Sequence, residues 1–139
     1  MTTPTEPLLV TSAANALLVA VRKGVRDGAA YRRGGALWLE GDHLCAAAAA
    51  RGVAVRHALV SESAWARAER RSLARHAERV LRLPDALFAT LSGLESPSDI
   101  GFVLDGPPVA VPDVALDTVV LDRLQDAGNV GSILRSAAA

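Results

Sequence analysis

Short apolar runs alternate with helix-like segments from residue 12 to residue 104, and this alternation limits the possible folds more than any other feature of the sequence. Apolar runs that suit buried strands lie at 36–40, 53–60, 78–82 and 100–104. Segments with helix caps or terminating glycines lie after Thr11 or Ser12, from Asp42 to Gly52, from Ser61 through roughly His76, and from Pro84 to Gly93. This order predicts an α/β fold, with a mostly parallel sheet and helices on both of its faces.

Five basic side chains lie in the first expected helix or in the loop after it, and Asp27 is the only acid between Ser12 and Gly35. The five are Arg22, Lys23, Arg26, Arg32 and Arg33. Two interpretations stay open, because such a group can keep a helix surface soluble or can contact the phosphates of a polyanion. In the second interpretation, Tyr31 is a candidate stacking residue.

The helix expected after Ser61 is also rich in arginine. It carries Arg67, Arg70, Arg71 and Arg75, with Arg79 and Arg82 beyond it, together with Glu69 and Glu78. The preferred interpretation is a solvated helix face with some internal ion pairing. A second contact with a polyanion is the alternative.

Charge is divided unevenly along the 139 residues, although the formal net charge is zero. Residues 1–82 hold 13 Lys and Arg against 7 Asp and Glu, whereas residues 83–139 hold 2 against 8. The basic residues 1–82 are therefore a candidate polyanion-binding region, and the acidic residues 83–139 are expected to have a different role. Hydrophobic residues make up 50% of the chain but in short segments, which argues against both a disordered chain and a membrane span.

The N-terminus has no signal-peptide pattern, and the single Cys45 cannot form an internal disulfide, so we expect a cytoplasmic location. Cys45 is interpreted as a packing residue, because no partner has the spacing of a metal ligand. His43, His57 and His76 are scattered along the chain, and none is assigned to a metal.

Four parts follow from these patterns: a flexible leader at 1–10, an α/β domain at 11–104, a linker at 105–115 that contains three prolines, and a C-terminal segment at 116–139. In the C-terminal segment, 116–121 is apolar enough for a buried strand, 122–128 is a polar turn, and Asn129 is a natural cap for a helix.

Several polar residues and glycines follow this last expected strand, at the end where ligands bind in open α/β sheets. They are Asp126, Gly128, Asn129, Gly131, Ser132 and Arg135. A well-capped turn between a strand and a helix is the simpler interpretation. The letters GNVG match neither the dinucleotide-binding pattern nor a phosphate loop with its lysine, so nucleotide hydrolysis is disfavoured.

The stretch LDRLQDAGNVGSILRSAAA resembles the first motif of the SpoU (TrmH) branch of the SPOUT RNA methyltransferases. The domain before it resembles the N-terminal, L30e-like substrate-binding domain of the same family. That likeness lies in Ser12 and Asn15 before the first helix, in WLEG at 38–41, and in LFATLSGLESP, which ends at Pro97. Two departures are Ala16, where the family often has proline, and a first helix with fewer lysines.

The resemblance implies an S-adenosylmethionine-dependent enzyme that methylates the ribose 2′-hydroxyl of structured RNA, either ribosomal or transfer RNA. It implies that Asn129 and Arg135 are catalytic. It also implies that Asn15, Arg22, Lys23, Arg26, Arg32 and Arg33 are candidate RNA contacts. In that family the cofactor pocket belongs to later motifs of a knotted domain, which also pairs two subunits into a homodimer.

No part of the sequence corresponds to those later motifs, so we expect a truncated catalytic domain at 116–139 that neither binds the cofactor nor methylates RNA by itself. Two alternatives stay open. The chain could be a stand-alone L30e-like RNA-binding module, or an α/β domain that binds a small ligand or a protein.

Overall fold

The computed structural model of this protein describes residues 6–27, 36–106, 111 and 113–139. The chain divides into two compact units, Met1–Pro108 and Val109–Ala139, which are described separately. Among the described residues, no helix is long and apolar enough to cross a membrane.

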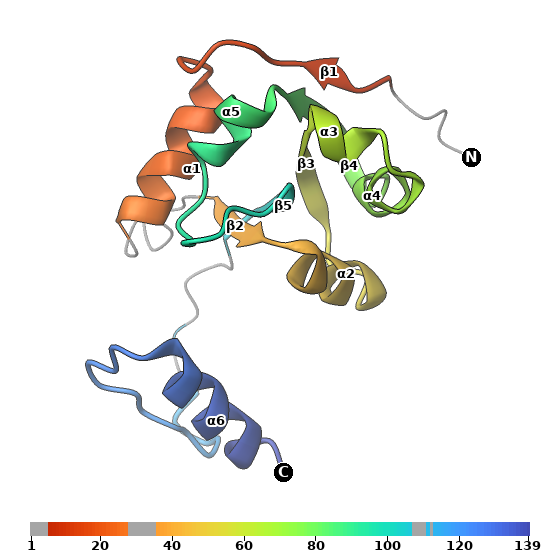
Figure 1. Cartoon of the computed structure of the whole chain (residues 1–139). Helices are drawn as coiled ribbons and strands as arrows, with labels where there is room; N and C mark the ends of the chain where they lie inside the picture. The colour runs from red at the N-terminus through yellow and green to blue at the C-terminus, as the bar shows by residue number, and fades with distance from the viewer. Residues whose placement is uncertain (1–5, 28–35, 107–110, 112) are drawn as a thin grey trace. The chain divides into compact units, whose positions relative to one another are not determined.

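The first unit is built on a five-stranded sheet (Figure 1). Its strands are β1 (Leu8–Leu9), β2 (Leu37–Glu40), β3 (Val55–Ser61), β4 (Ala77–Leu83) and β5 (Ile100–Leu104), in the order β1-β4-β3-β5-β2. Neighbours β1, β4 and β3 are parallel, whereas β5 is antiparallel to both β3 and β2. Only β5 therefore runs against the other strands, and the predicted mostly parallel sheet is confirmed.

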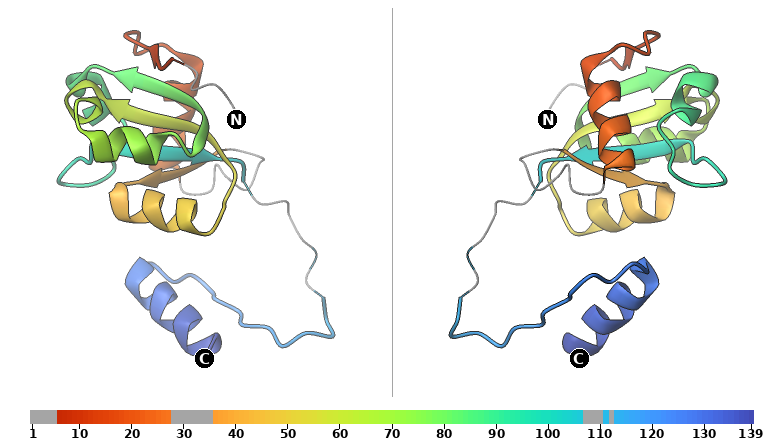
Figure 2. Two further views of the ribbon diagram at one scale, coloured as in Figure 1. Left: turned by 90° about the vertical axis from the view of Figure 1, so that its right-hand side faces the viewer. Right: turned by 90° about the vertical axis from the view of Figure 1, so that its left-hand side faces the viewer.

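Helices cover both faces of this sheet (Figure 2). They are α1 (Ala16–Arg26), α2 (Asp42–Ala50), α3 (Glu62–Trp65), α4 (Ala68–Ala74) and α5 (Asp85–Ala89). Leu18 and Val21 of α1 and Phe88 of α5 share one buried cluster with sheet residues, while α2, α3 and α4 contribute to a separate cluster that contains Phe102. The expected three-layer α/β/α architecture is confirmed.

Strand β5 follows β4 through residues 84–99, which include the 5-residue helix α5. Glu40, at the end of β2, holds the loop that leads into β5, because its carboxylate accepts hydrogen bonds from the backbone N–H groups of Gly93 and Ser98, both at 3.3 Å.

The single helix predicted from Ser61 to about His76 is wrong, because two helices, α3 and α4, occupy this stretch. The predicted cap at Ser61 is confirmed, since its hydroxyl accepts a hydrogen bond of 3.2 Å from the backbone N–H of Ala64. Arg71 stabilises the break, because its guanidinium donates to the carbonyls of Trp65 at 2.8 Å and Ala66 at 2.7 Å. Those carbonyls would otherwise lack helical partners.

The start of the first unit also differs from the prediction. Leu8 and Leu9, which the sequence placed in a flexible leader, pair with β4, and Val10 is buried in the core. The cap of α1 is Asn15 rather than Thr11 or Ser12: its side-chain oxygen accepts a hydrogen bond of 3.0 Å from the backbone N–H of Leu17. The core therefore begins a few residues earlier than the amphipathic pattern indicated.

The second unit contains one helix, α6 (Ala127–Ala137), within its described residues. The helix itself was predicted, but it begins before Asn129 and is capped by Asp126, whose carboxylate accepts a hydrogen bond of 2.9 Å from the backbone N–H of Asn129.

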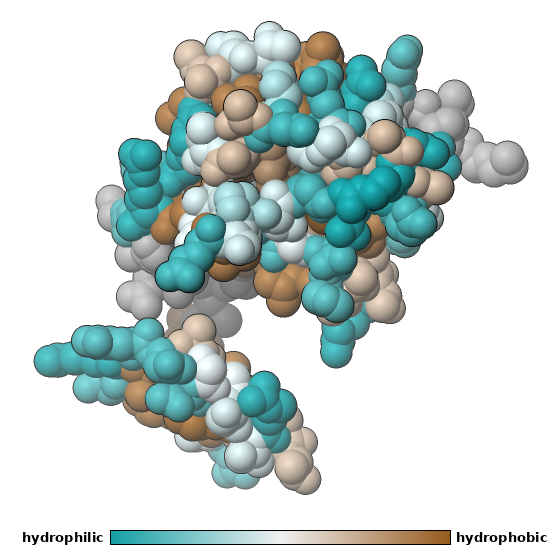
Figure 3. All heavy atoms as spheres, in the orientation of Figure 1, coloured by the Kyte–Doolittle hydropathy of each residue, from teal (hydrophilic) through white to brown (hydrophobic). Residues whose placement is uncertain are grey.

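The strand predicted at 116–121 is absent. Hydrophobic residues lie at the surface of this unit instead (Figure 3), with Leu116 67% and Val120 82% exposed. The physical reason is that a strand requires a partner for its backbone hydrogen bonds, and no strand is present among the described residues of this unit.

Candidate nucleic-acid interface

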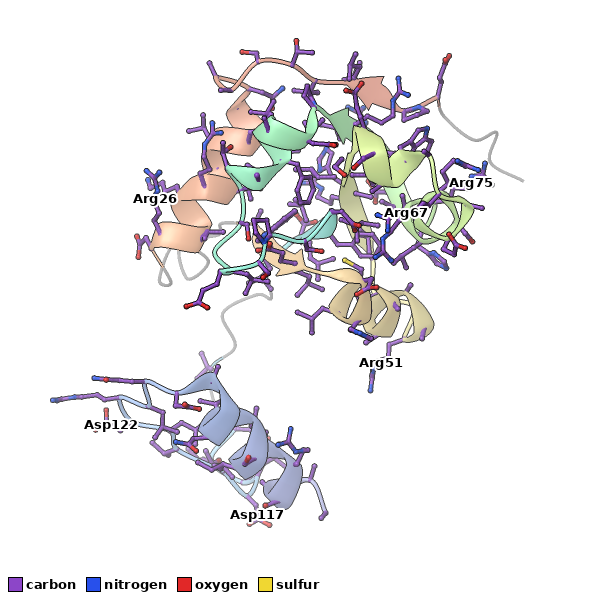
Figure 4. All side chains as sticks on the ribbon, in the orientation of Figure 1. Arg26, Arg51, Arg67, Arg75, Asp117 and Asp122 are labelled. Atoms are coloured by element: carbon purple, nitrogen blue, oxygen red, sulfur yellow. The ribbon has the colours of Figure 1, made fainter. Side chains whose placement is uncertain are left out.

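The last turn of α1 presents two basic side chains to solvent. Leu18 and Val21 turn the apolar face of α1 towards the sheet, which leaves Lys23 and Arg26 exposed. Figure 4 shows Arg26 projecting outward at the end of this helix. Neither side chain forms an ion pair with any other described residue. Cations at this position also interact favourably with the helix dipole, so their placement has a structural benefit independent of any ligand.

Two further predicted contacts, Asn15 and Arg22, have partners within the first unit. The side-chain oxygen of Asn15 caps α1. The Arg22 guanidinium donates to the Thr90 hydroxyl at 3.1 Å and also to the carbonyl of Ala13, so it ties α1 to the end of α5. Arg32 and Arg33, together with Tyr31, lie outside the described residues.

The arginines in and next to α4 lie on another side of the first unit from Arg26, as Arg67 and Arg75 show (Figure 4). Arg70 is central to this group, with a side chain only 19% exposed. Its guanidinium bridges Asp42 at 3.0 Å and Asp99 at 2.9 Å, and Arg67 also pairs with Asp99. Arg75 is exposed and forms no ion pair with another described residue. Internal pairing therefore accounts for most of this arginine-rich stretch.

This ion-pair network fixes the charge of its members. Burial by itself would raise the pKa of Asp42, but the hydrogen bond and positive charge of Arg70 outweigh it and lower that pKa below its ordinary value. Burial likewise opposes the charged form of Arg70, yet the hydrogen bonds to Asp99 and Asp42 raise the Arg70 pKa. Asp42 and Arg70 are therefore ionised at neutral pH, and the Arg70 guanidinium links Asp42 to Asp99 within the fold.

Cys45 is fully buried, as expected for a packing residue. Burial raises the pKa of its thiol to about 12, which keeps the sulfur protonated and unreactive at neutral pH. Among the described residues, no group of three or more His, Cys, Asp or Glu side chains could hold a metal ion.

A groove between α2 and α4 was not expected from the sequence. It has a volume of about 670 Å³ and brings together His43 of α2 and His76, which follows α4. The two histidines are 33 positions apart in the sequence, and only the packing of two separate helices on one face of the sheet places them along the same groove. No local pattern in the sequence could have indicated this.

In the second unit, α6 gathers several of the predicted polar residues. The Arg135 guanidinium donates to the Ser132 hydroxyl at 3.1 Å, and that hydroxyl donates to the carbonyl of Gly128 at 2.9 Å. A side-chain carbon at Gly131 would lie 3.3 Å from the Arg135 guanidinium, so glycine leaves room for it. The structure thus brings Ser132 and Arg135 together. Asn129 lies one turn before Ser132, with its backbone N–H held by Asp126.

Comparisons with solved structures find this fold in RNA methyltransferases. An RNA 2′-O ribose methyltransferase matches with a TM-score of 0.66 and 20% identity, over 94% of this chain and 52% of its own. A protein from Porphyromonas gingivalis assigned to the TrmH family of RNA methyltransferases matches with a TM-score of 0.56 and 23% identity, over 91% of this chain and 49% of its own. An S-adenosylmethionine-bound rRNA methyltransferase from Sinorhizobium meliloti matches with a TM-score of 0.50 and 15% identity, over 71% of this chain and 36% of its own.

These similarities show that the chain has the fold of one part of those enzymes, and that it spans about half the length of the first of them. No protein-family model and no curated protein matches the sequence.

Proposed function

We propose that the chain is the RNA-binding part of an S-adenosylmethionine-dependent RNA 2′-O-ribose methyltransferase, together with the beginning of its catalytic domain. The observation that carries the proposal is the match to an RNA 2′-O ribose methyltransferase over 94% of the chain. The motif around Asn129 and Arg135 adds independent support, because it resembles the first SpoU motif. The substrate is structured RNA, either ribosomal or transfer RNA, and the resemblance adds that the intact enzyme is a homodimer. A cytoplasmic location is part of the proposal.

In this proposal the first unit holds the RNA, with Lys23 and Arg26 as phosphate contacts. Arg22, Arg32, Arg33 and Asn15 complete the surface that the resemblance assigns to RNA. Arginine and lysine contacts to phosphates supply most of the sequence-independent affinity for a nucleic acid.

Arg135 is assigned to the ribose 2′-hydroxyl. This group is a weak nucleophile, so methyl transfer requires in-line positioning and stabilisation of the negative charge that develops on its oxygen. A guanidinium stays protonated in proteins, so Arg135 orients the hydroxyl and stabilises that charge, and does not act as a base. Ser132 holds the guanidinium from one turn earlier, and Asn129 helps position the arginine or the ribose.

The 139 residues by themselves do not form a cofactor site in this proposal. A pocket for a molecule of that size buries most of the ligand surface, whereas no residue of α6 is buried. Calorimetric titration of the chain with S-adenosylmethionine is therefore expected to show no heat beyond dilution. Tight binding by these residues alone would contradict the proposal.

RNA binding can be tested on the same chain by changing two cations together. The Lys23→Gln/Arg26→Gln double variant should weaken binding to structured RNA, and the slope of log affinity against log salt should become shallower by about 1.5, because two phosphate contacts are lost. The Arg32→Gln/Arg33→Gln double variant is expected to act in the same direction. Fluorescence anisotropy at several salt concentrations measures both effects.

The control is Arg56→Gln, which removes one positive charge, whereas each double variant removes two. Arg56 pairs with Asp105 at 3.1 Å, so it already has a partner within the fold. A loss of log affinity with this control that reaches half the loss of the double variant would mean that only total charge matters, and would count against an interface on α1. A chain that binds RNA without any methyltransferase activity after extension to full length would instead favour the stand-alone RNA-binding module.

A further inference from the structure

The groove between α2 and α4 is an open surface groove with a volume of about 670 Å³. Ala46 and Ala68 line it from the two helices, and Leu73 adds apolar surface. Small side chains on both walls leave the space open. The groove is therefore a preformed depression that an apolar, flat group could enter.

Charge in this groove is largely balanced by the fold. Asp42 and Arg70 both line it, but they pair with each other at 3.0 Å, and Arg70 also pairs with Asp99. Glu69 is the other acidic residue in the lining. A strongly charged small ligand would gain little from so balanced a site. An uncharged ring could enter the groove without needing a charged partner there, while any charged group attached to the ring stays outside the groove.

Two histidines line the groove, and both are exposed. His43 lies on α2 with its side chain exposed, and His76 follows the end of α4. The Nδ1 atom of His76 is 3.1 Å from the carbonyl oxygen of Leu73, and this hydrogen bond holds the ring at the end of α4. Histidine rings are among the side chains on which unstacked RNA bases stack. Arg75 directly precedes His76 in the sequence, and its side chain is exposed.

We propose that this groove receives one unpaired base of the bound RNA, stacked against His43 and His76, with Arg75 near the adjoining phosphate. The proposal rests on the proposed RNA-binding function and adds a second contact surface to the one on α1. Paired bases in an RNA duplex keep their faces covered by their neighbours. The groove is accordingly specific for single-stranded segments such as loops and bulges.

The test compares a short oligoadenylate with a blunt RNA duplex of equal length, by fluorescence anisotropy on the full chain. His43→Ala and His76→Ala are each expected to weaken binding of the single strand by about tenfold, the value of one lost aromatic stack, and to leave duplex binding unchanged. His76→Phe keeps an aromatic face and should retain most of the affinity. Both histidines are exposed, so the variants should fold, which circular dichroism can verify.

Leu44→Ala is the matched control, because Leu44 is exposed on α2 beside His43 but does not line the groove. Equal binding of the single strand by wild type and both alanine variants would overturn the groove proposal. If the Lys23→Gln/Arg26→Gln variant still loses affinity in that case, the proposed function stands without it. A wild-type chain that binds neither RNA overturns both.

Discussion

Replacing Phe102 by alanine is expected to lower the free energy of unfolding of the first unit by about 3–5 kcal/mol. Phe102 lies on β5, between β2 and β3, where it pairs with Leu39 on one side and Ala58 on the other. Its side chain is fully buried in the cluster beneath α2, α3 and α4. The change removes most of an aromatic side chain and leaves a cavity in this buried cluster.

A domain of ordinary stability has only about 5–15 kcal/mol to lose, so this one substitution should bring the unit close to unfolding at room temperature. Urea denaturation followed by circular dichroism measures the effect. Val19→Ala is the matched control, since Val19 is 47% exposed on α1 and its truncation should change stability by less than about 0.5 kcal/mol. A loss for Phe102→Ala no larger than the control would show that this cluster is not the core.

The layers and the mostly parallel sheet could be predicted because they follow from patterns local to each segment. The apolar runs before Gly41 and after Gly52 have the length of buried strands, and the alanine-rich stretch between them has strong helix propensity. Each such element can bury its apolar face only by packing in layers. The alternation of strand-like and helix-like segments was thus sufficient to predict the fold class.

The errors occur where tertiary contacts decide the outcome. Leu8 and Leu9 become a strand because β4 offers them a free edge, which no pattern in a two-residue segment can reveal. The break between α3 and α4 depends on Arg71 reaching back to the carbonyls of Trp65 and Ala66. The apolar stretch at 116–121 has strand-like composition but no partner strand among the described residues of its unit.

The residues of the candidate site also include some whose positions could be predicted from the sequence and some whose positions could not. The basic residues of α1 and the polar residues of α6 are close in sequence, so helical spacing alone places Lys23 near Arg26 and Ser132 near Arg135. Arg22 looked equivalent to Lys23 in the sequence, yet it reaches Thr90, which is 68 positions away. The groove with His43 and His76 requires two helices from different parts of the chain. Such long-range pairings are set by packing and were beyond prediction from one sequence.

The other large effect is expected at Gly101, which the indole ring of Trp38 covers. Gly101 lies on β5 opposite Glu40 and Leu59, and a side-chain carbon built there would overlap three ring atoms of Trp38. The ring cannot easily move away, because it packs against Phe88 with ring centroids 6.3 Å apart. Gly101→Ala should therefore cost at least about 2 kcal/mol, even though alanine is ordinarily compatible with a strand.

A double-mutant cycle tests this explanation directly. Trp38→Leu removes the ring, so in that background Gly101→Ala should cost less by about 1 kcal/mol or more, measured by urea denaturation of all four proteins. Gly24→Ala is the matched control: Gly24 lies inside α1 with its nearest neighbour, the Ala36 carbonyl, 3.9 Å away, and alanine there should raise stability by about 0.5–1 kcal/mol. Additive costs in the cycle would mean that overlap with the Trp38 ring does not set the cost of a side chain at position 101.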